Sequence, residues 1–245
     1  MHGVIALKVT KTNIIPLFVL ILCCLAFLLL SYLSYNKIDK MASALAGMHN
    51  PVIVIDPGHG GEDGGASGNS VLEKDINLAI SLKLKNLLET SGLHVVMTRT
   101  TDVSIGDKTL DTIRERKVSD LHNRLKIVEA QGDCVLISVH QNHFTESRYS
   151  GAQMFYSTKN AGSKELAENI KNRVVELVQP ENKRETKPAT NSIYLLWNTK
   201  VPAVLVECGF LSNQSEAAKL NDKTYQQQIA FAIFSGMLDY IHTAY

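Results

Sequence analysis

The stretch VIVIDPGHGGEDGGASGNSVLE, residues 52–73, is the part of the sequence around which the remainder is organised. Its first four residues, Val52–Ile55, are apolar and β-branched, which is typical of a short buried strand. Asp56-Pro57-Gly58 then ends that strand abruptly. His59 is therefore expected on a loop at the carboxyl end of a strand, the edge at which open α/β sheets bind ligands.

The loop after His59 is rich in glycine and ends at Glu73, where a helical pattern begins. The glycines leave little side-chain bulk beside the histidine, so backbone or substrate can approach it closely. One imidazole on a tight loop and one carboxylate at a helix start suit two ligands of one metal ion. The same pair also fits an ordinary surface turn, so the rest of the chain has to decide between the two interpretations.

Beyond this loop, helical and strand patterns alternate along the chain. The spacing of apolar residues predicts helices over residues 74–91, 120–129, 163–178 and 225–240. Apolar runs predict strands over residues 94–97, 134–139, 151–156, 192–197 and 203–208. The charged segment Glu181–Asn191 contains proline and predicts an exposed loop. Residues 51–245 are thus expected to form a single α/β domain whose central sheet is mostly parallel or mixed and is flanked by helices.

The first 35 residues have a different character. Ile14–Leu33 contains no charged residue and is long enough to span a bilayer as a helix. A signal peptide has a shorter apolar core with a small-residue cleavage site directly after it, whereas the first such match, Ala44-Leu45-Ala46, lies well beyond the run. We interpret residues 1–35 as a transmembrane anchor or uncleaved signal and residues 36–50 as a tether, with a cleaved signal as the alternative. Lysines flank the run on both sides, so its charges do not set its orientation.

Charge and cysteine content argue against two classes of protein. The formal net charge of the 245 residues is +1, without a basic stripe, which argues against a nucleic-acid partner. The four cysteines do not form a disulfide framework, because Cys23 and Cys24 lie within the apolar N-terminal run. Cys134 and Cys208 lie in predicted strands and are expected as buried thiols; a disulfide would require those strands to be neighbours.

Candidate catalytic groups follow buried strands at widely separated points of the sequence. His140 comes directly after the apolar run 134–139, and Glu207 follows the apolar run 203–206. Strand ends that are distant in sequence meet at one edge of an α/β sheet, which brings these residues towards His59 and Glu73. Two histidines and one carboxylate are a common ligand set of hydrolytic zinc sites, and a second carboxylate supplies the general base.

Each of these residues has a plainer alternative. His140 could be a core histidine while His143, three residues later, is the ligand; we favour His140 because the buried run fixes it. A carboxylate at the end of an apolar strand is costly unless it is paired or used, which favours a catalytic Glu207. The alternative is a strand-end glutamate that faces water. The other histidines follow no comparable pattern and are expected to be surface or packing residues.

At this point the motifs carry a family resemblance. The chain from about Pro51 to Tyr240 resembles the zinc-dependent N-acetylmuramoyl-L-alanine amidases of bacterial autolysins and spore-cortex enzymes. The matching motifs, in the family order, are VIVIDPGHGGEDGGASG, LEKDINL, VVMTRTTD, ISVHQNH and PAVLVECGFLSN. The resemblance implies one zinc ion held by His59, Glu73 and His140, with Glu207 as the catalytic carboxylate. The implied reaction is hydrolysis of the amide between N-acetylmuramic acid and L-alanine in peptidoglycan.

The chain also departs from the usual autolysin, because it shows no wall-binding repeats. A single catalytic domain behind an apolar N-terminal segment, together with QNH at 141–143 and YLLW at 194–197, is similar to the germination-specific amidases of spore formers. That resemblance implies action on spore cortex, where stem-peptide removal allows muramic δ-lactam to form for germination. It also implies a lipoprotein activator as a candidate partner, a forespore or cortex location, and attachment to the membrane through the N-terminal helix.

Other functions compatible with the same motifs are a general vegetative autolysin, a zinc peptidase that acts on the stem peptide, and an inactive membrane-anchored regulator. The regulator would need a broken metal set, and all four expected residues are present. For either enzyme the substrate is outside the cytoplasm, so the domain is expected to be extracytoplasmic, membrane-anchored or secreted. The charged segment 181–187, which contains Lys183 and Arg184, is either a contact for an anionic wall polymer or partner, or a solvated loop.

Overall fold

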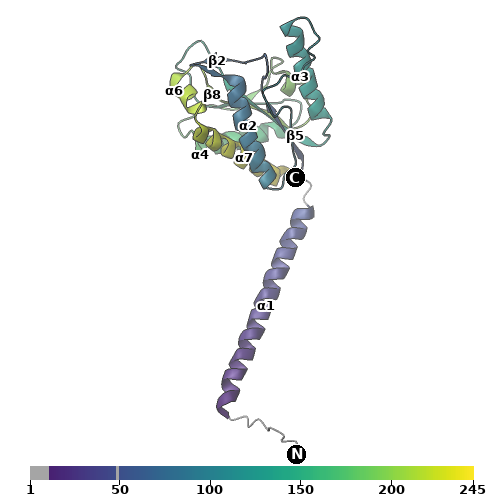
Figure 1. Ribbon diagram of the computed structural model, residues 1–245, viewed down its shortest axis with the longest axis vertical. Helices are drawn as coiled ribbons and strands as arrows, with labels where there is room; N and C mark the ends of the chain where they lie inside the picture. The colour runs from purple at the N-terminus through teal and green to yellow at the C-terminus, as the bar shows by residue number, and fades with distance from the viewer. Residues whose placement is uncertain (1–10, 48–49) are drawn as a thin grey trace, which may run out of the picture. The chain divides into compact units, whose positions relative to one another are not determined.

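The computed structural model describes residues 11–47 and 50–245, which fall into two compact units divided after His49. In the first unit, helix α1 spans Lys11–Gly47 and includes the apolar segment Pro16–Asn36, with a mean hydropathy of 2.7 (Figure 1). By length and composition this segment is a candidate membrane span, a test that a signal sequence also meets. Helix α1 continues through most of the segment 36–50 that we interpret as a tether.

The second unit is built on a six-stranded mixed sheet with the order β4-β1-β5-β8-β6-β7. Its strands are β1 (Val52–Pro57), β4 (Val95–Met97), β5 (Cys134–Asn142), β6 (Gln153–Tyr156), β7 (Lys187–Pro188) and β8 (Ala203–Phe210). Strands β4, β1, β5 and β8 are parallel, whereas β6 runs antiparallel to β8. The parallel strands place their carboxyl ends at one edge, where the glycine-rich loop also lies, and the predicted mixed α/β domain is confirmed.

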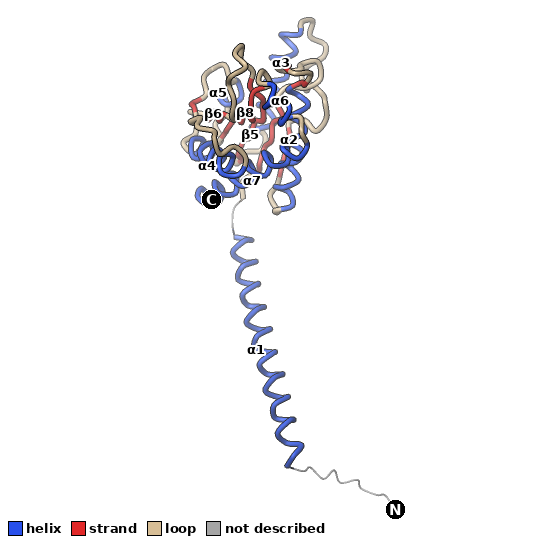
Figure 2. Tube along the Cα trace, turned by 90° about the vertical axis from the view of Figure 1, so that its left-hand side faces the viewer, coloured by secondary structure: helices blue, strands red, loops and turns tan. Residues whose placement is uncertain are grey.

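Helices cover both faces of this sheet (Figure 2). The elements of one face are α2 (Glu73–Thr90), α4 (Gly162–Leu177) and α7 (Lys223–Ala244), and those of the other are α3 (Ile113–Glu129) and α5 (Tyr194–Asn198). The sheet residues alternate between the two cores: Ile53 and Ile55 pack with the first set, and Val54 with the second. Helix α6 (Gln214–Leu220) follows β8, and the short strands β2 (Ser67–Gly68) and β3 (Val71–Leu72) form a hairpin within the glycine-rich segment.

Three local predictions need correction. The segment 192–197, predicted as a strand, contains the first turn of helix α5, because a short apolar run does not distinguish a strand from a buried helix. Helix α3 starts at Ile113 rather than at residue 120, after a capping box formed by Thr112 and Glu115. Two residues of the predicted loop 181–191 form the edge strand β7, which pairs with β6.

The two cysteines of the domain are buried free thiols, as expected. Their strands, β5 and β8, are neighbours, which was the condition for a disulfide. Cys134 nevertheless belongs to the core under α3 and α5, whereas Cys208 belongs to the core under α2, α4 and α7. The sheet therefore lies between the two thiols.

Candidate metal centre

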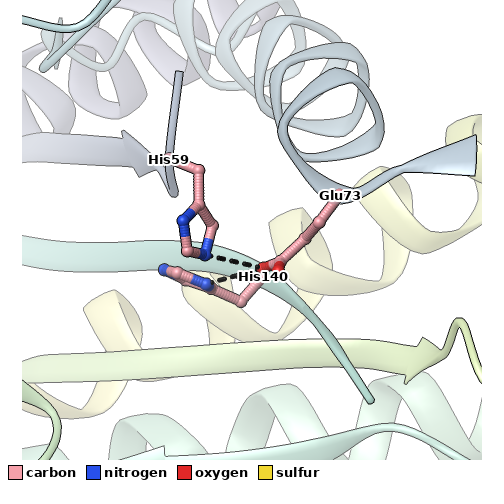
Figure 3. A group of neighbouring side chains, drawn as sticks. All are labelled: His59, Glu73 and His140. Carbon is pink, nitrogen blue, oxygen red and sulfur yellow. Dashed lines mark hydrogen bonds and ion pairs between the residues drawn. The ribbon is translucent and has the colours of Figure 1, made fainter. Parts of the chain in front are cut away.

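His59, Glu73 and His140 converge at the carboxyl edge of the sheet (Figure 3). Their nearest ligand atoms all lie within 4.8 Å of one another, an arrangement that can hold a metal ion. Glu73 Oε1 lies 3.3 Å from His59 Nε2 and 2.8 Å from His140 Nδ1. A loop after β1, the first residue of α2 and the end of β5 thus bring together the three residues that the sequence singled out.

The structure places the two histidines of the HQNH motif differently. His140 lies within β5 and belongs to the group with Glu73. His143 follows the end of that strand and is exposed. The other described histidines, His94, His122 and His242, are exposed as well, whereas His2 and His49 lie outside the described residues.

The glycine-rich loop closes tightly around these side chains. A Cβ on Gly58 would lie 2.2 Å from His140 Nε2. A Cβ on Gly65, whose φ is +68°, would lie 2.6 Å from Glu73 Oε2 and 2.7 Å from His59 Cδ2. His59 itself has a φ of +61°, a conformation that a residue with a side chain adopts only when its surroundings impose it. Because these glycines carry no side chain, His59 and Glu73 can come into contact.

Asp63, which the sequence analysis did not single out, orients His59. Its Oδ2 atom lies 2.9 Å from His59 Nδ1, which leaves His59 Nε2 directed at Glu73. The ammonium of Lys117, from helix α3, lies 2.8 Å from Asp63 Oδ1. A carboxylate on the outer nitrogen of a ligand histidine is a common feature of metal sites, because it fixes the tautomer and the ring orientation. In the sequence, the feature that could have identified Asp63 is its position as a carboxylate four residues after His59.

Glu73 is held by backbone and side-chain donors in addition to the histidines. Its Oε2 accepts a hydrogen bond of 2.8 Å from the Ala66 amide. Its Oε1 accepts bonds of 3.1 Å from the Gln141 amide and 3.2 Å from Asn77 Nδ2. Burial works to raise the pKa of Glu73, but hydrogen bonds from His140 and His59 hold it well below the usual range of a glutamate. The carboxylate is thus ionised and fixed in place.

The charge of Glu73 and Asp63 acts in turn on His59. Burial works to lower the pKa of His59, but the hydrogen bonds to Asp63 and Glu73 outweigh it and raise that pKa to about 9. The pocket therefore favours a positive charge between these groups. A metal cation supplies such a charge once the histidines lose their protons, since metal ligands bind in their deprotonated form.

Two buried arginines, Arg99 and Arg124, donate hydrogen bonds to backbone carbonyls at the end of β1 and in the loop after it. Arg124 of α3 lies 2.7 Å from Asp56 Oδ1 and donates a bond of 2.7 Å to the His59 carbonyl. Arg99, which follows β4, donates bonds of 2.9 Å to the carbonyls of Pro57 and Gly58. Strand and helix periodicity did not identify these buried cations, because the loop carbonyls and the Asp56 carboxylate that they contact are distant in sequence and are brought near only by the fold.

Glu207 lies on β8 as the register partner of His140 on β5. Its Oε2 atom is buried and has no hydrogen-bond partner among the described residues. Burial raises the pKa of Glu207 to about 7, although His140 acts in the opposite direction. A buried carboxylate oxygen without a partner is costly, so the site is suited to a polar group that the protein itself does not supply.

His59, His140 and Glu207 line a cleft of about 320 Å³. Helix α3 contributes Lys117 and Leu121 to its lining, and the segment before and within α5 contributes Ile193 and Tyr194. The two imidazole nitrogens, the carboxylate oxygen and the adjacent free carboxylate match the donor set of a hydrolytic metal site. The cleft thus offers room for a substrate directly beside those groups.

Comparison with known proteins agrees with this geometry. The family model described as N-acetylmuramoyl-L-alanine amidase matches residues 53–239. The germination-specific N-acetylmuramoyl-L-alanine amidase of Bacillus subtilis is 34% identical over 219 residues, which cover 88% of this chain and 92% of that protein. The amidase LytC of the same organism is 35% identical over 199 residues, 79% of this chain and 37% of the relative.

Among solved structures, the CwlD amidase from Clostridioides difficile, determined in complex with the GerS lipoprotein, is similar with a TM-score of 0.77. It is 43% identical, and the match covers 79% of this chain and 100% of that chain. The family match extends over nearly the whole Asn50–Tyr245 unit. This chain therefore belongs to the N-acetylmuramoyl-L-alanine amidase family of cell-wall hydrolases.

Proposed function

We propose that the chain is a zinc-dependent amidase that cleaves the bond between N-acetylmuramic acid and L-alanine, with His59, Glu73 and His140 as the zinc ligands. The observation that supports this most directly is the convergence of their ligand atoms within 4.8 Å. The unpartnered Oε2 of Glu207 beside them supports its assignment as the catalytic carboxylate. Two histidines and one carboxylate are a common ligand set of hydrolytic zinc sites, so these residues would hold the ion.

When bound, zinc would polarise the lactyl carbonyl and lower the pKa of the attacking water. Glu207 accepts a proton from that water as its oxygen adds to the carbonyl carbon. The same carboxyl then donates the proton to the alanine nitrogen as the carbon–nitrogen bond breaks. The products are a lactyl carboxylate on intact muramic acid and a peptide with a free L-alanine amine.

The biological setting that we infer is the spore cortex, where this cleavage allows muramic δ-lactam formation. The germination-specific relative from B. subtilis supports it, because it matches over almost its full length. We further infer that residues 1–35 anchor the chain or direct its export, that residues 36–50 tether residues 51–245, and that this catalytic domain acts outside the cytoplasm. The GerS complex of the similar C. difficile amidase supports a lipoprotein as a partner of this chain also.

The test is product analysis with the full chain in detergent, with and without a candidate lipoprotein, on cortex peptidoglycan. We expect metal analysis to find one zinc per chain, and mass spectrometry to find peptides with a free L-alanine N-terminus. Cleavage within the stem peptide would instead assign a peptidase. Zinc-loaded protein that releases neither product under either condition would contradict the proposed activity.

A further inference from the structure

A second groove, of about 200 Å³, is lined by residues of β6, β7 and β8 and of the loops next to them. Its lining includes Phe144, Tyr149 and Phe210, together with the cations Arg184 and Lys187. The rings form an aromatic cluster: the centroids of Phe144 and Tyr149 are 5.1 Å apart, and those of Tyr149 and Phe210 are 6.2 Å apart. We call this feature the β6 groove, because Gln153 at the start of β6 also lines it.

The β6 groove adjoins the metal centre across successive strands of the sheet. Glu207 on β8 is the register partner of His140 on one side and of Gln153 on the other. Register partners on adjacent strands direct their side chains to the same face of a sheet. The order across this face is therefore metal ligand, catalytic carboxylate and groove.

If Glu207 acts as in the proposed function, this order determines which end of the scissile amide bond faces the metal ligands and which end faces the groove. The acyl carbon has to lie at the metal ligands, whereas the alanine nitrogen receives its proton from Glu207. The leaving peptide then extends from Glu207 away from His140, towards Gln153 and the β6 groove. The muramic acid on the acyl side of the bond then lies in the cleft between α3 and α5, whose lining includes Tyr194.

The charges of the β6 groove are complementary to such a peptide. Within the described residues, 11–47 and 50–245, neither Arg184 nor Lys187 forms an ion pair with an acidic side chain. The cations on the cleft side of the metal centre are paired instead: Lys117 with Asp63, and Arg124 with Asp56. The two unpaired cations are therefore available to an anionic ligand.

Arg184 is also fixed in position before any ligand arrives. Its Nε donates a hydrogen bond of 2.8 Å to the Ser150 carbonyl. Its guanidinium carbon lies 4.6 Å from the centroid of the Phe210 ring. A guanidinium held by a backbone acceptor and an aromatic face loses little side-chain entropy when it binds a carboxylate, and its fork matches that group.

We propose that the β6 groove binds the stem peptide of the substrate and that Arg184 and Lys187 recognise its free carboxylate next to the cleaved alanine. In peptidoglycan the residue after L-alanine is a glutamate linked through its side chain, so its α-carboxylate is available for such a contact. The segment 181–187 is thereby a substrate-binding loop. This inference rests on the proposed amidase activity and adds a binding site for the peptide half of the substrate.

The test compares two soluble muropeptides that differ only in whether this α-carboxylate is free or amidated. With the zinc-loaded full chain in detergent, we expect kcat/KM about tenfold higher for the free carboxylate, mainly through a lower KM. Lys187→Gln and Arg184→Gln should each bring that ratio towards one. Arg184→Lys, which keeps the charge but not the fork, should retain part of the preference.

Lys183→Gln is the matched control, because Lys183 is an exposed cation of the same loop that does not line the β6 groove. It should keep the wild-type ratio. Lys187 is exposed on the edge strand β7, so its replacement tests the inference even where Arg184→Gln impairs folding. A wild-type ratio near one, or a ratio that neither groove variant changes, would overturn the inference. Failure of the wild type to cleave either muropeptide, both with and without the candidate lipoprotein, would count against the amidase activity itself.

Discussion

Glu207 and His140 occupy register positions opposite each other on the parallel strands β8 and β5, but their side chains differ in their hydrogen bonds. His140 Nδ1 lies 2.8 Å from Glu73 Oε1, whereas Glu207 Oε2 is buried without a partner among the described residues. A folded protein tolerates such a carboxylate where a ligand or a reaction uses it. This difference supports the proposed roles, with His140 as a metal ligand and Glu207 as the proton-transfer group.

The first prediction concerns Glu207→Gln. We expect this variant to keep one zinc per chain, because Glu207 is not a member of the ligand group. Turnover should fall by about a hundredfold to ten-thousandfold, the usual contribution of a general base. Metal analysis and muropeptide release on the same sample provide the measurement. Wild-type turnover in Glu207→Gln would remove the role assigned to this residue.

The second prediction concerns the support of His59 by Asp63. Asp63→Asn removes the charge that lies 2.9 Å from His59 Nδ1, so zinc affinity should fall by about tenfold to a hundredfold. Competition with a chromophoric chelator measures this affinity. Glu62→Gln is the control, since the adjacent Glu62 pairs with Arg116 instead and should leave zinc affinity unchanged. Equal affinities of Asp63→Asn and the wild type would show that His59 is oriented without this carboxylate.

The third prediction separates backbone strain from crowding at the metal centre. Gly65 and Gly92 both have positive φ, +68° and +84°. A Cβ on Gly92 would meet nothing within 4 Å, so Gly92→Ala should cost about 1–2 kcal/mol of stability and leave zinc binding intact. A Cβ on Gly65 would lie 2.6 Å from Glu73 Oε2, so Gly65→Ala should also lose zinc. The zinc content of each variant after dialysis distinguishes Gly65→Ala from Gly92→Ala. If Gly65→Ala kept all of its zinc, crowding at Glu73 would not explain the need for glycine at this position.

The fourth prediction is the acid sensitivity of the buried pair Asp56–Arg124. Burial works to raise the pKa of Asp56, but Arg124 and the hydrogen bonds from Thr98 and Ser138 together outweigh it, and the pKa falls from 3.8 to about 2. A carboxyl whose pKa is lowered by folding stabilises the protein above its unfolded pKa and loses that contribution as the pH falls through the folded value. On the order of 2 kcal/mol should therefore disappear between about pH 4 and about pH 2.

Asp56→Asn tests this contribution directly. At neutral pH the variant should be less stable by about 3 kcal/mol, since it leaves Arg124 without this charged partner. The difference from the wild type should narrow as the pH falls through the same window. Urea unfolding followed by the fluorescence of Trp197, the single tryptophan, measures both proteins. A difference that stays constant down to about pH 2 would argue against a lowered pKa of Asp56.

Local sequence determined the elements whose apolar pattern was long and unambiguous. The runs at 52–55, 134–139 and 203–208 became the three central strands β1, β5 and β8, because continuous β-branched and apolar residues fit a strand covered on both faces. His140 and Glu207 directly follow the apolar residues of their strands, and His59 lies just after β1, so the end of a buried run identified them. The capping box at Thr112 was also present in the sequence as a start signal for α3.

Only the tertiary structure decided what surrounds these residues. Residues 194–197 of the run at 192–197 became part of helix α5 rather than a strand, because packing over the sheet overrides a short local pattern. Arg124 reaches the His59 carbonyl from 65 positions away, and Arg184 reaches Ser150 from 34 positions away. Such contacts join polar groups that are distant in the chain and follow no period. The sequence by itself therefore determined which residues are candidates for the chemistry, whereas the fold determined how they are oriented and which groove lies beside them.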